Sequence, residues 1–338
     1  MKPKTAFLFL IISSIIILNT SSAWAGWVSA PSMQECHGSL GGAVDKDGRI
    51  YAIGGTIDNS GTIDGKVERF DEHTGLWSYT TPLNVPRSYL GATTDSTGQI
   101  YAVGGFTYLP STSPVNTVER FDPTTETWVS VADMNVNRAG AGVVADQSGR
   151  IYAIGGSDGS NSLSSVERYD PLLNQWDIIT NLPTPRSYSN ATLGPDGAIY
   201  AIGGYDGSSW LNSVLKYSSA LDTWTEVAPI SLARNVAASV TGPDGYIYAI
   251  SGYNGSYTNI VERYDCITNS WSNVSPLLNA RNNSGVVVTQ SGYIYIFGGD
   301  IGYYRTDTVE KLYVVPEPAT LLLLSLGGLI IRKLKFKN

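Results

Sequence analysis

Charged side chains of the kinds found in catalytic and anion-binding sites recur along the chain at a regular spacing. An arginine occurs once in each of five successive segments, at Arg87, Arg138, Arg186, Arg234 and Arg281, and His37 takes the corresponding place before them. Glutamates recur too, at Glu68, Glu119, Glu167, Glu262 and Glu310. A ring of arginines could bind an anion, but groups that repeat at equivalent points beside opposite charges are typical of structural ion pairs. We therefore predict that the arginines support the fold, and we assign no catalytic residue.

The arginines belong to a larger repeat. Double glycines follow one another at intervals of 47 to 51 residues, at Gly54-Gly55, Gly104-Gly105, Gly155-Gly156, Gly203-Gly204 and Gly298-Gly299, with Ser251-Gly252 in the fifth place. A tryptophan recurs with the same period, at Trp27, Trp77, Trp128, Trp176, Trp224 and Trp271. Six copies of each marker predict six structural units.

Each unit reads as four short strands. In the third unit, the small residues 140–145 are followed by Asp146-Gln147-Ser148-Gly149, a turn whose glycine can adopt the positive φ of a tight hairpin. The β-branched and aromatic segment 151–154 then ends in the double glycine. After a variable loop come a Val-Glu-Arg-Tyr-Asp segment and the tryptophan strand. Four short strands in each unit, without helical periodicity, indicate an all-β propeller.

The double glycine after a hydrophobic strand and the tryptophan at the end of the unit resemble the kelch repeat, over residues 26–313. The resemblance implies a six-bladed propeller in a domain spanning residues 26–315. The sixth unit stops after Val309–Tyr313 without a tryptophan strand, whereas Trp27 opens the body without preceding strands. We therefore expect residues 26–29 to complete the sixth blade and close the ring.

One face of the propeller should carry the long, varied loops, in which Tyr108, Trp210 and Tyr257 stand among Ser, Asn and Gly. This mixture is typical of binding surfaces. In kelch propellers, the residue after the double glycine and those after the repeated arginine line a central pocket. On this resemblance, together with the aromatic loops, we assign ligand binding to Phe106, Tyr205, Tyr253, Ser88, Tyr89, Ser187, Tyr188, Asn235, Asn282 and Trp210. The same positions also include Asn283 and Asp300.

Composition and repeat position argue against several other functions. Residues 26–315 carry 16 Lys and Arg against 28 Asp and Glu, so the surface lacks the positive charge that nucleic acid requires. His37 and His73 are the only histidines, and the repeat places them on opposite faces, so we predict no metal site and no cofactor. Cys36 and Cys266 fall on opposite faces as well, and we predict no disulfide between them.

Both ends of the chain carry targeting patterns. Lys2 and Lys4, the apolar residues 6–18 and Ala23-Trp24-Ala25 predict a cleaved signal peptide over residues 1–25, with a retained N-terminal anchor as the alternative. Near the other end, residues 319–331 are apolar and four basic residues follow. This order predicts a short membrane anchor whose basic end stays in the cytoplasm.

The triplet Pro316, Glu317 and Pro318 precedes that apolar segment. Triplet, apolar segment and basic end, residues 316–338, resemble the PEP-CTERM sorting signal of Gram-negative bacteria. The resemblance implies an exosortase-type membrane protease as a partner; the alternative is a proline-stiffened stalk before an ordinary anchor. We expect an exported protein, anchored in the inner membrane as a precursor and then located at the cell surface or outside the cell.

The propeller fold and the two targeting segments together predict a surface binding or scaffold module, and not an enzyme. Its loop-rich face would recognise an extracellular polysaccharide or a protein. The alternative is a sugar-active enzyme, because six-bladed bacterial kelch proteins include sialic acid epimerases, which the chain resembles in fold and export. For that alternative, Asp300 with a neighbouring arginine is the acid–base candidate.

Overall fold

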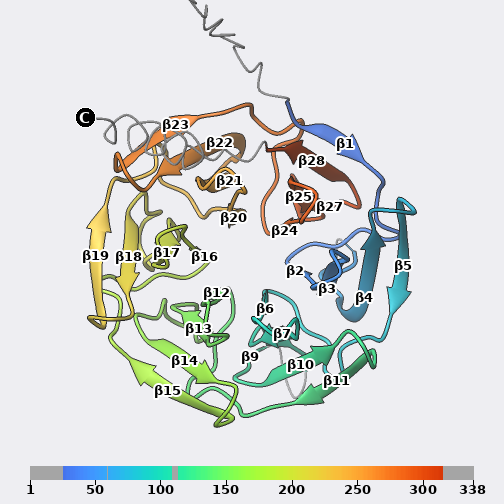
Figure 1. Cartoon of the computed structure of the whole chain (residues 1–338), viewed down its shortest axis with the longest axis horizontal. Coiled ribbons are helices and arrows are strands. Elements are labelled where there is room, and N and C mark those ends of the chain that lie inside the picture. Colours follow the sequence, from blue (N-terminus) through green and yellow to red (C-terminus); the bar gives the residue numbers. More distant parts are fainter. Residues whose placement is uncertain (1–25, 59, 109–112, 315–338) are drawn as a thin grey trace, which may run out of the picture.

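Six four-stranded antiparallel sheets surround a central axis in a computed structural model of the chain (Figure 1). The structure describes residues 26–58, 60–108 and 113–314. Every described regular element in it is a strand. The prediction of an all-β, six-bladed propeller is therefore confirmed.

Five blades run in chain order from the axis outward. The first consists of β2 (Gly41–Val44), β3 (Ile50–Thr56), β4 (Ile63–Asp71) and β5 (Leu76–Thr80). The second consists of β6 (Gly91–Thr94), β7 (Ile100–Val103), β10 (Val118–Asp122) and β11 (Thr127–Ser130). The third consists of β12 (Gly142–Ala145), β13 (Ile151–Ile154), β14 (Val166–Asp170) and β15 (Gln175–Ile179). The fourth consists of β16 (Asn190–Leu193), β17 (Ile199–Ile202), β18 (Val214–Ser218) and β19 (Thr223–Val227). The fifth consists of β20 (Ala238–Thr241), β21 (Ile247–Tyr253), β22 (Tyr257–Asp265) and β23 (Ser270–Asn273).

The sixth blade joins the two ends of the propeller. Its inner strands are β24 (Gly285–Val288), β25 (Tyr293–Phe297) and β28 (Val309–Tyr313), and its outer strand is β1 (Val28–Ala30). β1 is antiparallel to β28, with Val28 opposite Lys311. Trp27 is only 3% exposed and packs in the core of this blade. An N-terminal strand therefore covers the edge that β28 would otherwise leave open.

The repeated tryptophans explain how neighbouring blades are joined. The Trp128 ring packs against Phe121 of the same blade, at a centroid distance of 4.9 Å. Its indole N–H donates a hydrogen bond to the Thr81 carbonyl, in the connection from the preceding blade, at 3.0 Å. Trp77, Trp176, Trp224 and Trp271 donate equivalent bonds. Each of these rings therefore fills a core between two sheets while its polar atom stays paired.

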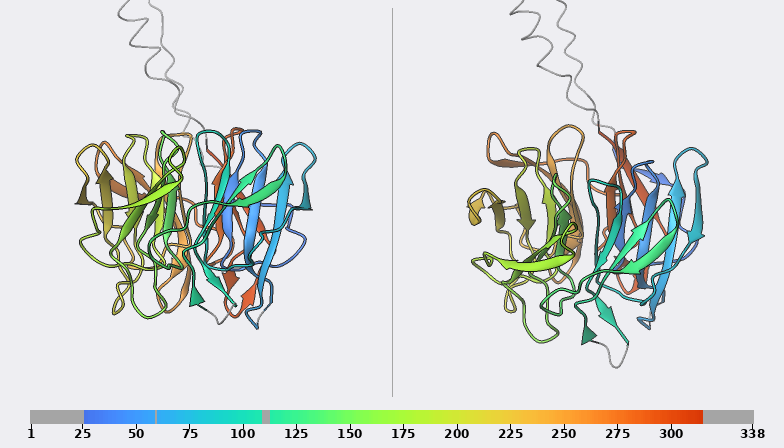
Figure 2. Two further views of the ribbon diagram at one scale, coloured as in Figure 1. Left: turned by 90° about the horizontal axis from the view of Figure 1, so that it is seen from below. Right: turned by 60° about the horizontal axis from the view of Figure 1, so that its bottom comes forward.

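The two faces of the propeller differ. We call the side that carries the turns between strands one and two and between strands three and four the hairpin-turn face, and it is uppermost in Figure 2. The opposite, loop-rich face carries the blade-to-blade connections and two added hairpins, β8 (Phe106–Thr107) with β9 (Ser113–Pro114) and β26 (Asp300–Ile301) with β27 (Tyr304–Arg305). These hairpins project from the lower side in Figure 2.

The described chain ends on the hairpin-turn face. The Val314 N–H donates to the carbonyl of Gly292, in the turn between β24 and β25, at 2.9 Å. The predicted signal peptide (1–25) and sorting signal (316–338) lie outside the described residues. Within residues 26–314, as far as they are described, no helix has the length and apolar character needed to cross a membrane. Cys36 and Cys266 are free thiols, and both are half-buried.

Candidate functional site

Buried arginine–glutamate ion pairs hold the connections that enter four of the six blades. Four of the repeated arginines pair with glutamates, at 2.8 Å for Arg87–Glu119, 2.5 Å for Arg138–Glu167, 2.9 Å for Arg234–Glu262 and 2.7 Å for Arg281–Glu310. Nearly all of these side chains are inaccessible to solvent. Glu119 also accepts the backbone N–H groups of Asn84 and Val85. Each pair therefore fixes a loop, which agrees with a structural role.

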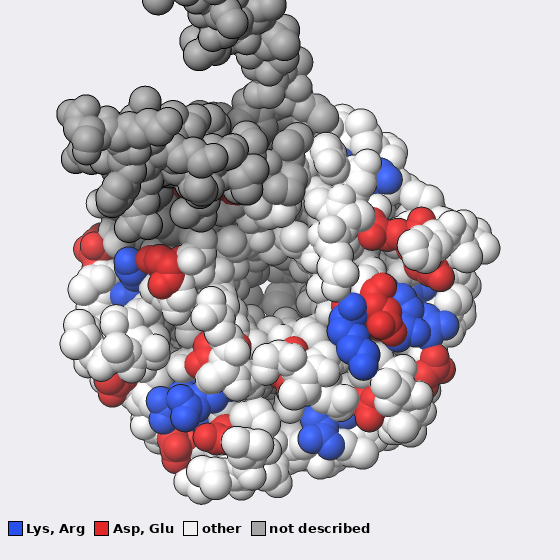
Figure 3. Space-filling view, in the orientation of Figure 1, with Lys and Arg blue, Asp and Glu red and all other residues white. Residues whose placement is uncertain are grey.

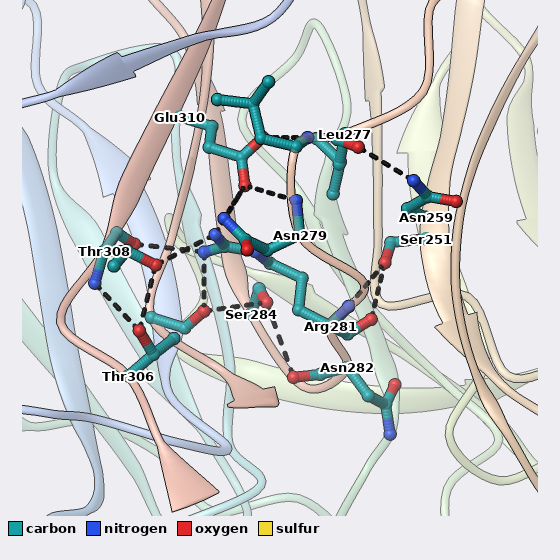
Figure 4. A network of polar contacts seen from close by, with 12 residues as sticks. Ser251, Asn259, Leu277, Asn279, Arg281, Asn282, Ser284, Thr306, Thr308 and Glu310 are labelled. Carbon is teal, nitrogen blue, oxygen red and sulfur yellow. Dashed lines mark hydrogen bonds and ion pairs between the residues drawn. The ribbon is translucent and has the colours of Figure 1, made fainter. Parts of the chain in front are cut away.

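Figure 4 shows this arrangement around Arg281. Its guanidinium donates to Glu310 at 2.7 Å and to the carbonyls of Gly298 and Thr308 at 3.0 Å each. The side chain of the next residue, Asn282, points away from this network. The ion pair thus fixes the backbone from which Asn282 projects.

The fourth blade departs from the pattern, because Leu215 stands where the others have glutamate. Arg186 instead donates to the carbonyls of Gly203 and Ser213, at 3.3 and 3.4 Å, and to the Ser213 hydroxyl at 3.2 Å. Burial lowers the pKa of Arg186 to about 10, so the guanidinium is still charged at neutral pH.

A backbone bridge follows the arginine position in every blade. The next residue pairs with the residue after the double glycine, in Gly38–Thr56, Ser88–Phe106, Ala139–Ser157, Ser187–Tyr205, Asn235–Tyr253 and Asn282–Asp300. The double glycines themselves adopt positive φ, which turns the chain toward the axis. The six bridges therefore place one pair of residues per blade around the loop-rich mouth of the propeller.

One residue further on, the backbone adopts positive φ in five of the six blades. Ser39, Tyr89, Gly140, Tyr188 and Asn283 all have φ between 52° and 60°. Positive φ costs free energy for bulky residues such as Tyr89 and Tyr188 and is often found at functional sites. This conformation allows a series of backbone hydrogen bonds between neighbouring blades, at 2.8 to 3.0 Å. In each bond an N–H group donates to a carbonyl: Ser39 to Asn283, Tyr89 to Ser39, Gly140 to Tyr89 and Tyr188 to Gly140.

This series is interrupted at the fifth blade. The equivalent residue is Val236, whose branched side chain disfavours positive φ, and its φ is not positive. Among the residues that the structure describes, no backbone hydrogen bond joins Val236 to Tyr188 or to Asn283. The ring of bonds around the axis is therefore open between the fourth and sixth blades.

A pocket of about 240 Å³ opens on the loop-rich face at this interruption. We call it the face pocket; it is lined by Tyr89, Tyr188, Trp210, Asn235, Tyr253, Tyr257, Asn282, Asn283 and Asp300. Trp210 and Tyr257 each make an edge-on contact with Tyr253, at 5.8 and 5.1 Å between ring centroids. The wall formed by the fourth and fifth blades is therefore aromatic, and the wall formed by the sixth is polar.

Asp300 dominates the polar wall. Its carboxylate accepts a hydrogen bond from Asn283 at 2.8 Å and forms an ion pair with Arg305 at 3.0 Å. Burial nevertheless raises the pKa of Asp300 above its usual value. Burial raises the pKa of Tyr257 as well, with a smaller contribution from the Asp300 charge. Asp300 can therefore accept or donate a proton closer to neutral pH than an ordinary aspartate.

An amide oxygen in the pocket has no protein partner. Asn282 is 6% exposed, and its Oδ1 makes no hydrogen bond within the described structure. A buried polar atom without a partner costs free energy unless a ligand or water satisfies it. The pocket thus offers an acceptor beside the Asp300 carboxylate, opposite the aromatic wall.

Along the propeller axis, the face pocket is followed by a second cavity and then by the axial channel. Tyr89, Tyr188 and Asn283 line both the face pocket and the second cavity. The two tyrosine rings contact edge to face at 5.5 Å, and Asn283 donates to the Tyr89 hydroxyl at 3.4 Å. Below them, a channel of about 350 Å³ runs between the innermost strands, and its mouth is the central hollow in Figure 3. The three side chains separate the pocket from the channel.

The structure brings six of the predicted ligand residues into the pocket lining: Tyr89, Tyr188, Asn235, Tyr253, Asn282 and Trp210. The other four lie behind it. Phe106 packs on Tyr89, Tyr205 packs on Trp210, and Ser88 and Ser187 are buried in their bridges.

Two contributors were not assigned from the sequence. The sequence marks Tyr257 as one of several aromatic residues on the varied face, and it does not single out Arg305 as the partner of Asp300. Tyr257 is the first residue of β22, and Arg305 lies in the β26–β27 hairpin. Both follow a connection between strands two and three whose length differs from blade to blade, so the repeat gives no register there. Tyr257 reaches the pocket because β21 and β22 extend past a register shift, which pairs it with Tyr253.

Comparison with known proteins agrees with this architecture. A family model described as the KLHDC2/KLHL20/DRC7 Kelch-repeats domain matches residues 41–241 and 134–299. No curated protein matches the chain. A solved structure titled "Structure of YjhT" superposes with a TM-score of 0.74 and 15% sequence identity, covering 85% of this chain and 98% of that one. At this identity the likeness concerns the fold.

The expectation that the chain is not an enzyme is corrected here. The chain shares its fold with YjhT, and a propeller fold by itself does not decide between binding and catalysis, so the repeated structural arginines gave no ground for excluding catalysis. The exclusion also overlooked the environment of Asp300, a buried carboxylate with a raised pKa in an open pocket.

The repeats, the six closed blades and the family match agree with one another. The chain belongs to the KLHDC2/KLHL20/DRC7 kelch-repeats domain family.

Proposed function

We propose that the chain is a binding module that holds a segment of extracellular polysaccharide in the face pocket. The observation that carries the proposal is the pairing of an aromatic wall, Trp210 with Tyr253, with the unpartnered Asn282 amide oxygen. A sugar ring offers both an apolar face and hydroxyl donors, and sites with aromatic walls and a few fixed polar groups suit such ligands. Asp300 adds a second acceptor for hydroxyl groups.

Affinity electrophoresis of the full chain in detergent tests this proposal. Gels would contain galactomannan, xyloglucan or soluble starch, and W210A would be compared with wild type. We expect one polysaccharide to retard the wild type, and W210A to bind about tenfold more weakly, which corresponds to about 1.4 kcal/mol. Y303A, which changes an exposed tyrosine outside the pocket lining, is the matched control.

Equal retardation of wild type and W210A would contradict the proposal. So would the absence of retardation in every gel combined with Trp210-dependent capture of a purified surface protein, which would make the ligand a protein.

The proposal includes the route to the cell surface. We propose that residues 1–25 are removed on export and that an exosortase-type membrane protease recognises Pro316, Glu317 and Pro318. The order of triplet, apolar segment and basic end supports this route. E317A should keep the chain in the inner membrane, and mass spectrometry of the surface fraction would show whether the wild type ends near residue 316. An identical surface fraction and mass for E317A would contradict sorting through the triplet.

A second candidate function is acid–base chemistry on a bound sugar. It is favoured by the raised pKa of Asp300 and by Arg305 at 3.0 Å, which can stabilise the ionised form during proton transfer. Proton NMR of N-acetylneuraminate and of neutral reducing sugars would detect interconversion of isomers. D300N should abolish any such activity while leaving retention on polysaccharide within a few-fold of wild type.

A further inference from the structure

Exposed aliphatic side chains gather on one rim of the hairpin-turn face. In the described part of the chain, six large apolar side chains are at least 67% exposed: Leu76, Leu172, Leu173, Leu221, Ile267 and Tyr303. All but Tyr303 lie in the turn between strands three and four of a blade, or directly after it. Tyr303 lies in the β26–β27 hairpin of the opposite face. Leu172 and Ile267 are 95% and 94% exposed, so they contribute almost nothing to packing within the propeller.

The turns do not need these side chains for their own conformation. The Asp170 carboxylate accepts the N–H of Leu172 at 3.0 Å, and the Asp265 carboxylate accepts that of Ile267 at 2.8 Å. In the second blade, Asp122 holds the N–H of Thr124 in the same way. A polar residue therefore serves the turn equally well, and the aliphatic residues in blades three to five require another explanation.

The described chain ends on the same hairpin-turn face as these exposed turns. Tyr313, the last residue of β28, takes the place that Asp170 and Asp265 take at the ends of β14 and β22. In the sixth blade the described chain ends at Val314, where the other blades make this turn. The sequence then runs for 24 more residues, and its apolar segment 319–331 begins five residues after Val314. Five residues span at most about 17 Å.

We infer that the hairpin-turn face lies on a lipid bilayer, with Leu172, Leu173, Leu221 and Ile267 inserted among the headgroups. The inference goes beyond the proposed function, because it concerns how the propeller is held and not what it binds. An apolar C-terminal segment that starts within about 17 Å of Val314, on the same face, would keep this face at the membrane. Aliphatic side chains on turns can then bury their surface in the interface.

The charge of this face suits a bilayer irrespective of lipid charge. On the part of this face that is left uncovered in Figure 3, basic and acidic side chains lie side by side around the rim, and uncharged residues cover the area between them. Arg49 pairs with Asp45 and Lys216 with Asp196, at 2.7 Å each. With the basic groups paired in this way, apolar insertion, and not attraction to anionic lipid, would supply the contact.

Depth-dependent fluorescence quenching of the full chain in vesicles tests the inference. On a C36S/C266A background, single cysteines at Leu172, Ile267 or Tyr303 would carry an environment-sensitive label, and phosphatidylcholine vesicles would contain a nitroxide lipid. We expect labels at positions 172 and 267 to be quenched several-fold more than the label at position 303. The quenching should be unchanged when phosphatidylglycerol replaces part of the phosphatidylcholine.

A second variant keeps the inference falsifiable if labels disturb the rim. L172S/L173S/L221S/I267S should unfold at the wild-type temperature in detergent, because the side chains are exposed, but should lose protection of the rim from protease on vesicles. Flotation with vesicles combined with equal quenching at 172 and 303 overturns the docking and leaves an anchor intact. Failure to float overturns both, and protein-concentration-dependent protection without lipid would assign the rim to a second copy of the chain. None of these outcomes bears on the face pocket, whose test is retention on polysaccharide.

Discussion

The Asp300 carboxylate lies 3.0 Å from the guanidinium of Arg305, and both side chains pack against Gly38 of the first blade. Asn283 donates to the other carboxylate oxygen at 2.8 Å. Residues from three separate loops thus hold one buried acid at the edge of the face pocket. At the position after the repeated arginine, the first blade has Gly38, whereas the other blades have serine, alanine or asparagine. The missing side chain at Gly38 leaves room for the Asp300–Arg305 ion pair.

The first prediction concerns the pH dependence that Asp300 contributes to stability. Its folded pKa is raised above the usual 3.8, mainly by burial, so the folded protein binds more protons than the unfolded chain between the two values. The stability of wild type relative to D300N should therefore fall as pH rises through that interval and be constant below about 3.8. Each pKa unit of elevation corresponds to about 1.4 kcal/mol. Urea unfolding of both proteins from pH 3 to 7 measures the difference; a difference that grows with pH would contradict the burial effect.

A methyl group at position 38 should disturb the pair without touching the ligand. A Cβ on Gly38 would overlap the Arg305 side chain and an Asp300 oxygen, so G38A should displace the ion pair. We expect weaker retention on polysaccharide and a small loss of thermal stability. G26A, where a Cβ meets nothing within 4 Å, is the matched control. Retention equal to wild type in G38A would mean that the pair lies outside the functional site.

The fourth blade provides a natural control for the buried ion pairs. E167L copies the fourth-blade residue Leu215 into the third blade and leaves the buried Arg138 without its partner. Breaking such a pair costs about 3–5 kcal/mol, so unfolding by heat or urea should occur much earlier. The reverse change, L215E, would add an acid near Arg186 and should alter stability by only about 1 kcal/mol in either direction. Similar losses in both variants would show that shape, and not the unpaired charge, determines the cost.

Closure of the ring predicts a large effect from one N-terminal residue. W27A would remove a side chain that is 3% exposed from the core of the sixth blade. A buried aromatic replaced by alanine typically costs about 3–5 kcal/mol. Limited proteolysis should then cut first in β1 or β28. V28A, at a side chain that is 51% exposed on the same strand, should leave both unfolding and proteolysis near wild type.

The fold could be read from the sequence because every blade solves the same packing problem. Five of the six repeated tryptophans, Trp128 among them, each fill one inter-blade core and donate to one carbonyl, so their period is the period of the structure. The site was harder, since it arises where the repeat fails. Val236 interrupts a series of inter-blade hydrogen bonds, and Tyr257 and Arg305 lie in strand extensions and an added hairpin that the blades do not share. Positions next to the repeated arginines, such as Asn235 and Asn282, keep their register in the repeat, and both lie in the pocket lining.

The pairing of β1 with β28 also sets the order of events during synthesis. The first strand to leave the ribosome finds its partner only when almost the last residue of the domain has been made. Until then five sheets can form, while the sixth lacks its outermost member and exposes a hydrogen-bonding edge. A chain that ends before residue 313 would lack part of β28, so β1 would have no complete strand to pair with. The exposed edges of β1 and of the sixth sheet would then mark the truncated product for proteolysis.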